Sequence, residues 1–268
     1  MTALLRAAHL GPALAVTVVA GVLALAAALR PATVALVVLA VLAGQLVIGW
    51  SNDLVDVRRD VQVGRPDKPL ATGEVDPRTV QVALGVAAVA VLGLSLALGW
   101  RAAIVHLVPG VGGGLAYNFG LKATWWSWLP YAVAFGTLPA VVTLAQTPPA
   151  WPPWPVMAAG ALLGVGAHFV NVLPDLDDDA ATGVRGLPHR LGHRVAQRVA
   201  TAVLVLASVT VVLGPQGPPT AFAWVALGAT LVLAAVAMLG RGRTPFRAAV
   251  GIALVNVVML TMAGASGP

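Results

Sequence analysis

Residues 33–60 read TVALVVLAVLAGQLVIGWSNDLVDVRRD, a long apolar segment that ends in a cluster of amide and carboxylate side chains. The apolar part is long enough to cross a bilayer of about 30 Å as a helix. Asn52, Asp56 and Asp60 follow at intervals of four, so on a helix they lie on one face, about one turn apart. Such side chains at a membrane helix end are costly unless they face a cavity or bind a cation. The stretch therefore predicts a membrane protein with a polar site at a helix end.

The composition of the whole chain is that of an integral membrane protein. Its 268 residues are 59% hydrophobic and only 10% charged, whereas a soluble domain carries about 25% charged residues. The net charge of +6 does not indicate a nucleic-acid partner, because the basic residues are spread over short loops that flank apolar spans. The chain has no cysteine, which excludes disulfides and thiolate metal sites.

We predict an all-α integral membrane protein with nine transmembrane helices, organised as one polytopic domain over residues 1–268. The first apolar segment is interpreted as a membrane span and not as a cleaved signal peptide. The ten-residue alternating segments of a membrane β-barrel do not occur in the sequence. The predicted spans are residues 12–29, 33–56, 78–99, 101–119, 127–146, 155–176, 195–213, 220–239 and 246–264.

The distribution of Lys and Arg predicts the orientation in the membrane. With the N-terminus and every second connection taken as one side, that side holds all but two of the 16 basic residues. The other side keeps only Arg30 and Arg101. By the positive-inside rule the basic side is cytoplasmic, so the N-terminus is expected inside and the C-terminus outside. All ten acidic residues fall within 53–76 and 175–179, both on the predicted cytoplasmic side.

A shift of 119 residues relates the two acidic regions. The predicted helices 2 and 6 would therefore open two related helix–loop units with the same membrane orientation, a parallel repeat. The shift places Asn52 on Asn171, Asp56 on Asp175, Asp60 on Asp179, Gly64 on Gly183, Pro69 on Pro188 and Gly73 on Gly192.

The second acidic cluster repeats the four-residue spacing of the first, with Asn171, Asp175 and Asp179. Two such faces opposed across a cavity would supply four carboxylates and two amides. Hard oxygen ligands without His or Cys suit Mg²⁺, which keeps waters and shares phosphate oxygens of a substrate. Because the two clusters repel each other when empty, we predict a site completed by Mg²⁺ and a strongly anionic ligand.

Basic residues near both clusters favour a diphosphate as that ligand, since Arg and Lys bind phosphate through charge-assisted hydrogen bonds. Mg²⁺ would stabilise the charge that develops on a diphosphate leaving group. A helix-lined apolar chamber would hold an isoprenoid tail and exclude water. For Arg78, Arg194, Arg198 and residues 241–247 we prefer a role in topology alone. The candidates for diphosphate binding are Arg65, Lys68, Lys122 and Arg185.

At these residues the chain resembles the UbiA superfamily of intramembrane prenyltransferases. The shared motifs are N-D-x-x-D-x-x-x-D at Asn52 to Asp60, the following Gly64 to Gly73, the segment Tyr117 to Lys122, and D-x-x-x-D at Asp175 to Asp179. The resemblance implies nine helices around a central chamber, with cytoplasmic cap connections after helices 2 and 6, in a bacterial cytoplasmic membrane with the active site on the cytoplasmic side.

The resemblance also implies roles for individual residues. Asp56 and Asp175 are expected to take part in catalysis together with Asp53, which could orient a ligand residue or help to position the acceptor. The four basic candidates are expected around the diphosphate. The expected metal ligands are Asn52, Asp56, Asp60, Asp175 and Asp179.

These residues are consistent with two enzymatic functions. One is transfer of a prenyl group from an allylic diphosphate to an acceptor, expected to be an electron-rich aromatic ring. The other is a terpene cyclase, in which an internal double bond captures the same cation. A transporter or lipid-binding protein with a degenerate site is disfavoured because the aspartates are intact. Prenyl length and acceptor identity depend on chamber shape, and the sequence gives no prediction of the oligomeric state. We interpret His168 as a hydrogen-bonded interior residue.

Overall fold

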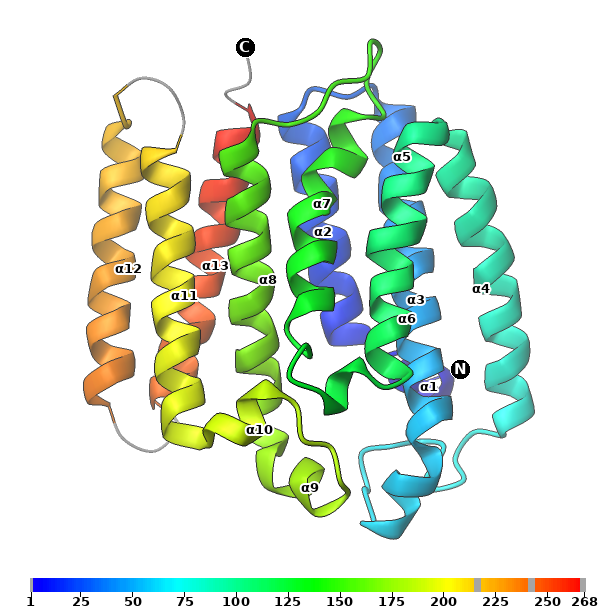
Figure 1. Ribbon diagram of the computed structural model, residues 1–268. Coiled ribbons are helices and arrows are strands. Elements are labelled where there is room, and N and C mark those ends of the chain that lie inside the picture. Colours follow the sequence, from blue (N-terminus) through cyan, green and yellow to red (C-terminus); the bar gives the residue numbers. More distant parts are fainter. Residues whose placement is uncertain (1, 215–217, 241–243, 266–268) are drawn as a thin grey trace. The chain divides into compact units, whose positions relative to one another are not determined.

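The computed structural model describes residues 2–214, 218–240 and 244–265. The side chains of residues 2, 177, 178, 261 and 263–265 lie outside this description, and these include Asp177 and Asp178 of the second acidic cluster. Within the described ranges all regular secondary structure is helical (Figure 1). The helices form two compact units, the N-terminal unit (Met1–Gly120 with Val141–Ala150) and the C-terminal unit (Leu121–Ala140 with Trp151–Pro268).

The N-terminal unit is built around its longest helix, α3. Its elements are α1 (Thr2–Ala7), α2 (Leu10–Ala26), α3 (Pro31–Gln62), α4 (Pro77–Ala97), α5 (Trp100–Val105), a π-helical turn (His106–Gly112) and α6 (Gly113–Asn118). α3 packs against α2, α4 and α6. Both α3 and α4 begin with proline, whose fixed φ suits the first helical position. The side chain of Asp76 caps α4 by accepting a hydrogen bond from the backbone N–H of Arg78.

Close packing fixes the N-terminal segment against the polar end of α3. A Cβ on Gly49 would collide with the backbone oxygen of Ala8, so only glycine allows this approach. Trp50 Nε1 donates a hydrogen bond of 2.9 Å to the carbonyl of Leu4. These contacts hold the segment before α2 beside the helix turn that precedes the first aspartate motif.

The predicted span 101–119 is helical but not uniform. Pro109 lies inside it and has no N–H to donate, which favours the π-helical turn between α5 and α6. In this turn His106 Nδ1 lies 2.8 Å from Ser95 Oγ, which satisfies a buried histidine. A Cβ on Gly114 would overlap the side chain of Ile48, so the glycines after the turn serve close helix packing.

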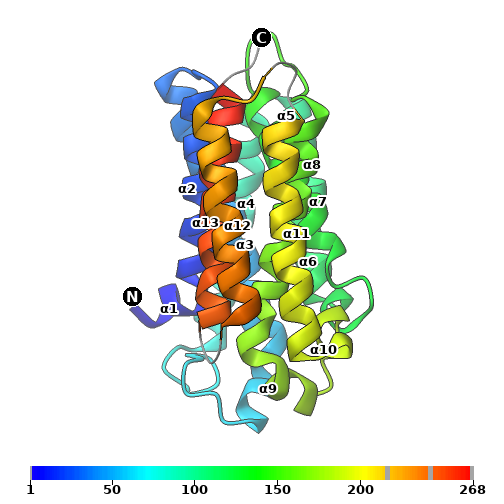
Figure 2. The same cartoon turned by 90° about the vertical axis from the view of Figure 1, so that its left-hand side faces the viewer.

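The C-terminal unit is organised around α11. Its elements are a 3₁₀ turn (Leu121–Ala123), α7 (Leu129–Thr143), α8 (Trp154–Val172), a 3₁₀ turn (Leu173–Asp175), α9 (Leu176–Ala181), α10 (Leu187–Leu191), α11 (His193–Leu213), α12 (Ala221–Leu239) and α13 (Thr244–Ala265). α11 packs against α8, α12 and α13 (Figure 2). Asn256 Nδ2 donates to the carbonyl of Leu204, and its Oδ1 lies 3.0 Å from Ser208 Oγ, so a polar contact joins two apolar helices.

Several of these helices can cross a membrane by length and composition. Five qualify in full, namely Pro31–Gln62, Pro77–Ala97, Trp154–Asp175, His193–Leu213 and Ala221–Leu239, and shorter apolar helices occur at Leu10–Ala26, Leu129–Thr143 and Thr244–Leu260. Together with the helical run over 100–118, they cover the nine predicted segments within the described residues. The number of nine spans itself stays a prediction.

The structure supports the predicted internal repeat. A shift of 119 residues carries α2 onto α7, α3 onto α8 and α9, α4 onto α11, and the run α5–α6 onto α12. The matched glycines share an unusual backbone conformation: φ is +67° at Gly64 and +85° at Gly183, and +75° at Gly73 and +73° at Gly192. Glycine adopts positive φ without steric cost, so the same turns explain the matched positions.

Candidate functional site

The first aspartate motif lies on one continuous helix. Because α3 extends to Gln62, Asn52, Asp56 and Asp60 share one helical face, as predicted. Asn52 Nδ2 donates to Asp56 Oδ2 at 3.2 Å and to Asn118 Oδ1 at 3.2 Å. Asn118 in turn donates to Ser51 Oγ at 2.8 Å, so the end of α6 orients the first residue of the motif.

The carboxylates of this motif are taken largely out of solvent. Asp56 and Asp60 are only 6% and 5% exposed. Arg59 forms an ion pair of 2.8 Å with Asp56, which offsets part of the cost of its burial.

The donor set of the motif fits a hard divalent cation, because its side chains offer only carboxylate and amide oxygens. Among the residues that the structure describes, however, no three His, Cys, Asp or Glu side chains gather closely enough to hold a metal ion. A Mg²⁺ ion at this motif would therefore need further oxygens from water, phosphate or the second motif.

Asp53 points into a different environment, where it forms a cluster with Lys68 and His9. Its carboxylate is 1% exposed, and Lys68 Nζ donates to Oδ1 at 2.7 Å. His9 Nε2 lies 2.9 Å from Asp53 Oδ1 and 2.9 Å from Lys68 Nζ. His9 reaches this position from a left-handed backbone conformation (φ 53°, ψ 53°) just before α2. The cluster ties three separate segments together at the motif.

This cluster bears on the prediction that Lys68 binds a diphosphate. Lys68 Nζ donates one of its N–H groups to Asp53 Oδ1, and the role of His9 Nε2 beside both of them depends on the histidine tautomer. Contact of Lys68 with a phosphate stays a proposal, and the structure adds a positioning role for the loop.

The loop between α3 and α4 is held by exposed ion pairs. Arg65 Nε and Nη2 donate to the two carboxylate oxygens of Asp67 at 3.0 and 3.1 Å. This bidentate contact holds the pKa of Asp67 below its ordinary value. Arg6 of α1 forms an ion pair with Glu74, which joins the N-terminal segment to the same loop.

The second motif lies on a helical run in which a 3₁₀ turn separates two α-helices, so its geometry differs from that of the first motif. α8 ends at Val172, Pro174 lies in a 3₁₀ turn, and α9 begins at Leu176. Proline lacks the N–H that an α-helix would need at this position, so the four-residue spacing of Asn171, Asp175 and Asp179 does not carry over as one helical stripe.

Individual residues of the second motif have their own contacts in the C-terminal unit. The side chain of Asn171 is hydrogen-bonded to Tyr131 of α7. Asp179 Oδ2 lies 3.4 Å from Nε2 of His189, a histidine of α10 whose side chain is 4% exposed. The buried imidazole therefore flanks one of the predicted metal ligands.

The structure brings the segment of Lys122 and the loop of Arg185 together within the C-terminal unit. Ser127 Oγ accepts a hydrogen bond of 2.9 Å from the backbone N–H of Leu187. Gly186 lies so close to the carbonyl of Lys122 that a Cβ would not fit. Lys122 is buried, whereas Arg185 is exposed.

The interpretation of His168 as an interior residue is confirmed. It is 1% exposed, its Nε2 lies 3.1 Å from Ser127 Oγ, and its ring packs against Tyr131 and Phe169. It supports α8 beside the second motif.

Three contact residues had not been singled out from the sequence. Asn118 lies in the segment Tyr117 to Lys122, so a motif already marked its position. His9 and His189 carry no such signal, because neither keeps a fixed spacing from the aspartates that they contact.

Comparison with known proteins identifies the family. The UbiA prenyltransferase family model matches residues 13–260. The chain belongs to the UbiA prenyltransferase family. The match covers both aspartate motifs and the helices that carry them.

Curated members of the family match part of the chain. It is 32% identical over 186 residues to the bacteriochlorophyll synthase 33 kDa chain of Cereibacter sphaeroides, covering 64% of this chain and 60% of that protein. It is 33% identical over 187 residues to the digeranylgeranylglyceryl phosphate synthase of Natronomonas pharaonis, covering 63% and 61%. The matched region spans about 60% of the length of these relatives.

Solved structures of family members share the fold. A UbiA homolog from Archaeoglobus fulgidus bound to DMAPP and Mg²⁺ superposes with a TM-score of 0.73 at 15% identity, covering 97% of each chain. The apo structure of a UbiA homolog from Aeropyrum pernix K1 gives 0.72 at 18% identity, covering 91% of this chain and 94% of that one. This chain thus has the UbiA fold of an integral membrane protein.

Proposed function

We propose that this protein is a Mg²⁺-dependent intramembrane prenyltransferase. It would ionise an allylic isoprenyl diphosphate and transfer the prenyl group to an acceptor, which we expect to be aromatic. The observation that carries the proposal is the stripe of Asn52, Asp56 and Asp60 on one face of α3, with both carboxylates buried in a member of this family. Buried membrane carboxylates without a functional role are rare.

The metal site would combine residues from both units. Asn52, Asp56 and Asp60 of the N-terminal unit and Asp175 and Asp179 of the C-terminal unit supply hard oxygen donors. When bound, Mg²⁺ would neutralise the charge of the diphosphate and so stabilise it as a leaving group.

The basic residues would bind and orient the diphosphate. Arg65 is held in a fixed orientation by Asp67, and Lys122 is packed against the loop that carries Arg185. Together with Lys68 they offer guanidinium and ammonium donors suited to phosphate oxygens. Orientation of the substrate before the bond breaks lowers the entropic part of the barrier.

The proposed transfer needs no reactant other than the allylic diphosphate and the acceptor. The allylic C–O bond breaks and its electron pair leaves with the diphosphate. A carbon of the acceptor then bonds to the allylic carbon, and the acceptor loses a proton to the released diphosphate. The apolar helices exclude water, which would otherwise capture the cation. The buried ion pair of Asp53 with Lys68 favours a positioning role for Asp53, which holds the loop beside Asp56.

Related structures support the choice of substrate class. The Archaeoglobus homolog was solved with DMAPP and Mg²⁺ and also with GPP and Mg²⁺. The curated relatives are named for different products: one is a chain of bacteriochlorophyll synthase and the other is a digeranylgeranylglyceryl phosphate synthase. For this chain we therefore propose an allylic diphosphate and leave the acceptor to experiment.

Purified protein should be incubated with Mg²⁺ and allylic diphosphates of several lengths, with and without phenolic acceptors, and the products analysed by mass spectrometry. We expect a prenylated acceptor and release of diphosphate, both abolished in Asp56→Ala and Asp175→Ala. Asp76→Asn is the matched control, because this residue caps α4 outside the motif. A cyclic hydrocarbon formed without acceptor would show a terpene cyclase instead, and diphosphate release that persists in both alanine variants would refute the metal site.

We also propose a cytoplasmic membrane location with the N-terminus and both motifs on the cytoplasmic side. The absence of native cysteine allows single-cysteine labelling. Val63→Cys after α3 should react only with a permeant reagent in intact cells, whereas Ala150→Cys should also react with an impermeant one. The reverse pattern would invert the orientation.

A further inference from the structure

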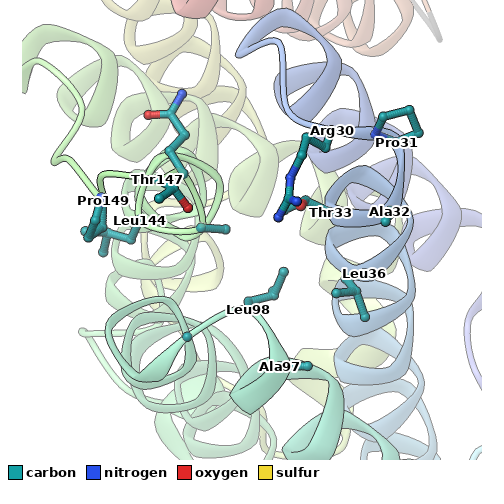
Figure 3. A pocket seen from close by; sticks show the side chains of 13 residues that line it. Arg30, Pro31, Ala32, Thr33, Leu36, Ala97, Leu98, Leu144, Thr147 and Pro149 are labelled. Atoms are coloured by element: carbon teal, nitrogen blue, oxygen red, sulfur yellow. The ribbon is translucent and has the colours of Figure 1, made fainter.

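A cavity lies at the end of the N-terminal unit opposite to the first aspartate motif. Its volume is about 510 Å³, within the range of small-molecule sites. It is open to the surface and is lined by the start of α3, the turn between α4 and α5, and the residues that follow α7 (Figure 3). The lining residues are Arg30, Pro31, Ala32, Thr33, Leu36, Ala97, Leu98, Gly99, Leu144, Ala145, Gln146, Thr147 and Pro149.

Arg30 is the one charged side chain among the described residues that line this cavity. Figure 3 shows its guanidinium directed into the space between α3 and Thr147. The remaining lining is mostly aliphatic, with polar groups only at Thr33, Gln146 and Thr147. A single cation in an apolar cavity is suited to an amphipathic anion.

A second cavity of about 250 Å³ adjoins the first and brings in another arginine. The two cavities share Gly99, Leu144 and Pro149, and the second is also lined by Trp100 and Arg101. The guanidinium of Arg101 lies over the Trp100 ring at 5.3 Å from its centroid. Arg30 and Arg101 are the two basic residues that the topology assigns to the non-cytoplasmic side, where arginine is disfavoured. Each of them lines one of the two adjoining cavities.

No carboxylate of the N-terminal unit is near enough to neutralise these arginines. All ten acidic residues of the chain lie within 53–76 and 175–179. Asp53 is the first of them and follows Arg30 by 23 positions along α3, which is about 34 Å at 1.5 Å per residue. The unit therefore holds two exposed cations at one end without an internal counter-ion, so they are accessible to an anion from outside the protein.

We propose that the two cavities bind the phosphate head group of an anionic phospholipid from the predicted outer leaflet. Each guanidinium can donate paired hydrogen bonds to phosphate. The N–H groups of Ala32 and Thr33 lie in the first turn of α3, where backbone donors lack helical acceptors and favour an anion. The site is independent of the proposed transferase reaction.

The surface beside the cavity favours a lipid over a free phosphate ion as the ligand. Val89, Leu92 and Leu96 are 75%, 51% and 54% exposed and lie on one face of α4. This apolar stripe ends one residue before Ala97, which lines the cavity, and would contact the acyl chains. Trp100 is 65% exposed at the same end, as expected for a residue at the level of lipid head groups.

The test measures lipid binding to the full, delipidated protein in non-ionic detergent. Native mass spectrometry would follow titration with phosphatidylglycerol and, separately, with phosphatidylcholine. We expect wild type to prefer phosphatidylglycerol, and Arg30→Gln and Arg101→Gln each to weaken its binding about fivefold, since one basic residue near a lipid surface contributes about that factor. The double variant should lose roughly 25-fold if the two effects multiply.

Two further variants separate this site from general charge effects. Arg78→Gln removes a cation at the opposite end of α4 and should leave phosphatidylglycerol binding unchanged. Ala97→Trp keeps both arginines but fills the cavity, so binding should fall while the protein stays folded. If Arg30→Gln does not fold, Arg30→Lys and Ala97→Trp carry the test, with weaker binding expected in both.

Wild-type affinity in the double arginine variant would overturn the proposal, and so would an equal loss in Arg78→Gln. Inorganic phosphate is the competitor that distinguishes a lipid from a free ion. Displacement of phosphatidylglycerol by millimolar phosphate would identify a small-anion site and would also overturn the assignment to a lipid.

Discussion

Replacing Lys68 with methionine should destabilise the protein strongly, because it leaves the buried carboxylate of Asp53 without its ammonium. Asp53 is 1% exposed, the Lys68 side chain is 11% exposed, and the pair is 2.7 Å apart. The second oxygen of Asp53, Oδ2, already lacks a hydrogen-bond partner among the described residues. Removing one partner of a buried ion pair costs about 3–5 kcal/mol. We expect about 3 kcal/mol, because His9 still lies 2.9 Å from the carboxylate.

A double-mutant cycle makes this prediction specific. The free energy of unfolding would be measured by SDS titration in mixed micelles for Lys68→Met, Asp53→Asn and the double variant. The free energy of unfolding should fall in the double variant by at least 1 kcal/mol less than the sum of the decreases in the two single variants, because the double variant leaves no unpaired buried charge. Arg65→Met is the control: its partner Asp67 is 58% exposed, so the loss should stay below about 1 kcal/mol.

The outcome that refutes this reasoning is a loss for Lys68→Met no larger than for Arg65→Met, together with additivity within about 0.5 kcal/mol. Lys68 would then be free to serve the diphosphate alone. Strong coupling in unfolding together with lost activity would instead show that the ion pair holds the loop that carries the substrate-binding residues.

Three further outcomes test the packing and the loop. Gly49→Ala should cost about 2–3 kcal/mol because its Cβ has no space against the N-terminal segment, whereas Gly85→Ala, which meets no atom within 4 Å, should be neutral or slightly stabilising in the same unfolding assay. Ser127→Ala should cost about 2 kcal/mol, since it leaves the part-buried N–H of Leu187 and the buried His168 without their shared partner. Arg65 lowers the pKa of Asp67 in the folded protein below its ordinary value of 3.8. The pair therefore stabilises the folded state at pH values above 3.8, and this stabilisation is lost as the pH falls through the pKa of the folded state. Unfolding measured between about pH 5 and pH 3 should show this loss, below about 1 kcal/mol, in wild type but not in Asp67→Asn; an identical pH profile would contradict the pairing.

The first motif was predictable because its geometry is local. Spacing by four residues puts Asn52, Asp56 and Asp60 on one face of any helix, and nothing in the stretch interrupts α3. The second motif was predicted less well for an equally local reason. Pro174 ends the α-helical pattern between Asn171 and Asp175, so equal spacing did not give equal geometry.

The contacts of His9 and His189 were beyond sequence reasoning. His9 meets Asp53 across 44 residues, and only after a left-handed turn at the start of α2. His189 meets Asp179 through the short α10, whose place depends on Gly186 packing against the 3₁₀ turn. Such contacts depend on packing between segments, which leaves no periodic pattern in the chain.

The sequence by itself determined the membrane setting, the helical fold, the repeat and the oxygen-rich motifs, because hydrophobicity, four-residue spacing and charge distribution act over one or two helical turns. Tertiary structure alone decided that Asp53 and Lys68 neutralise each other and that Arg30 and Arg101 line adjoining cavities at the far end of the unit. Burial and pairing depend on which surfaces meet when the helices pack. The sequence specifies which side chains are charged, and the fold determines which partner each charged side chain contacts.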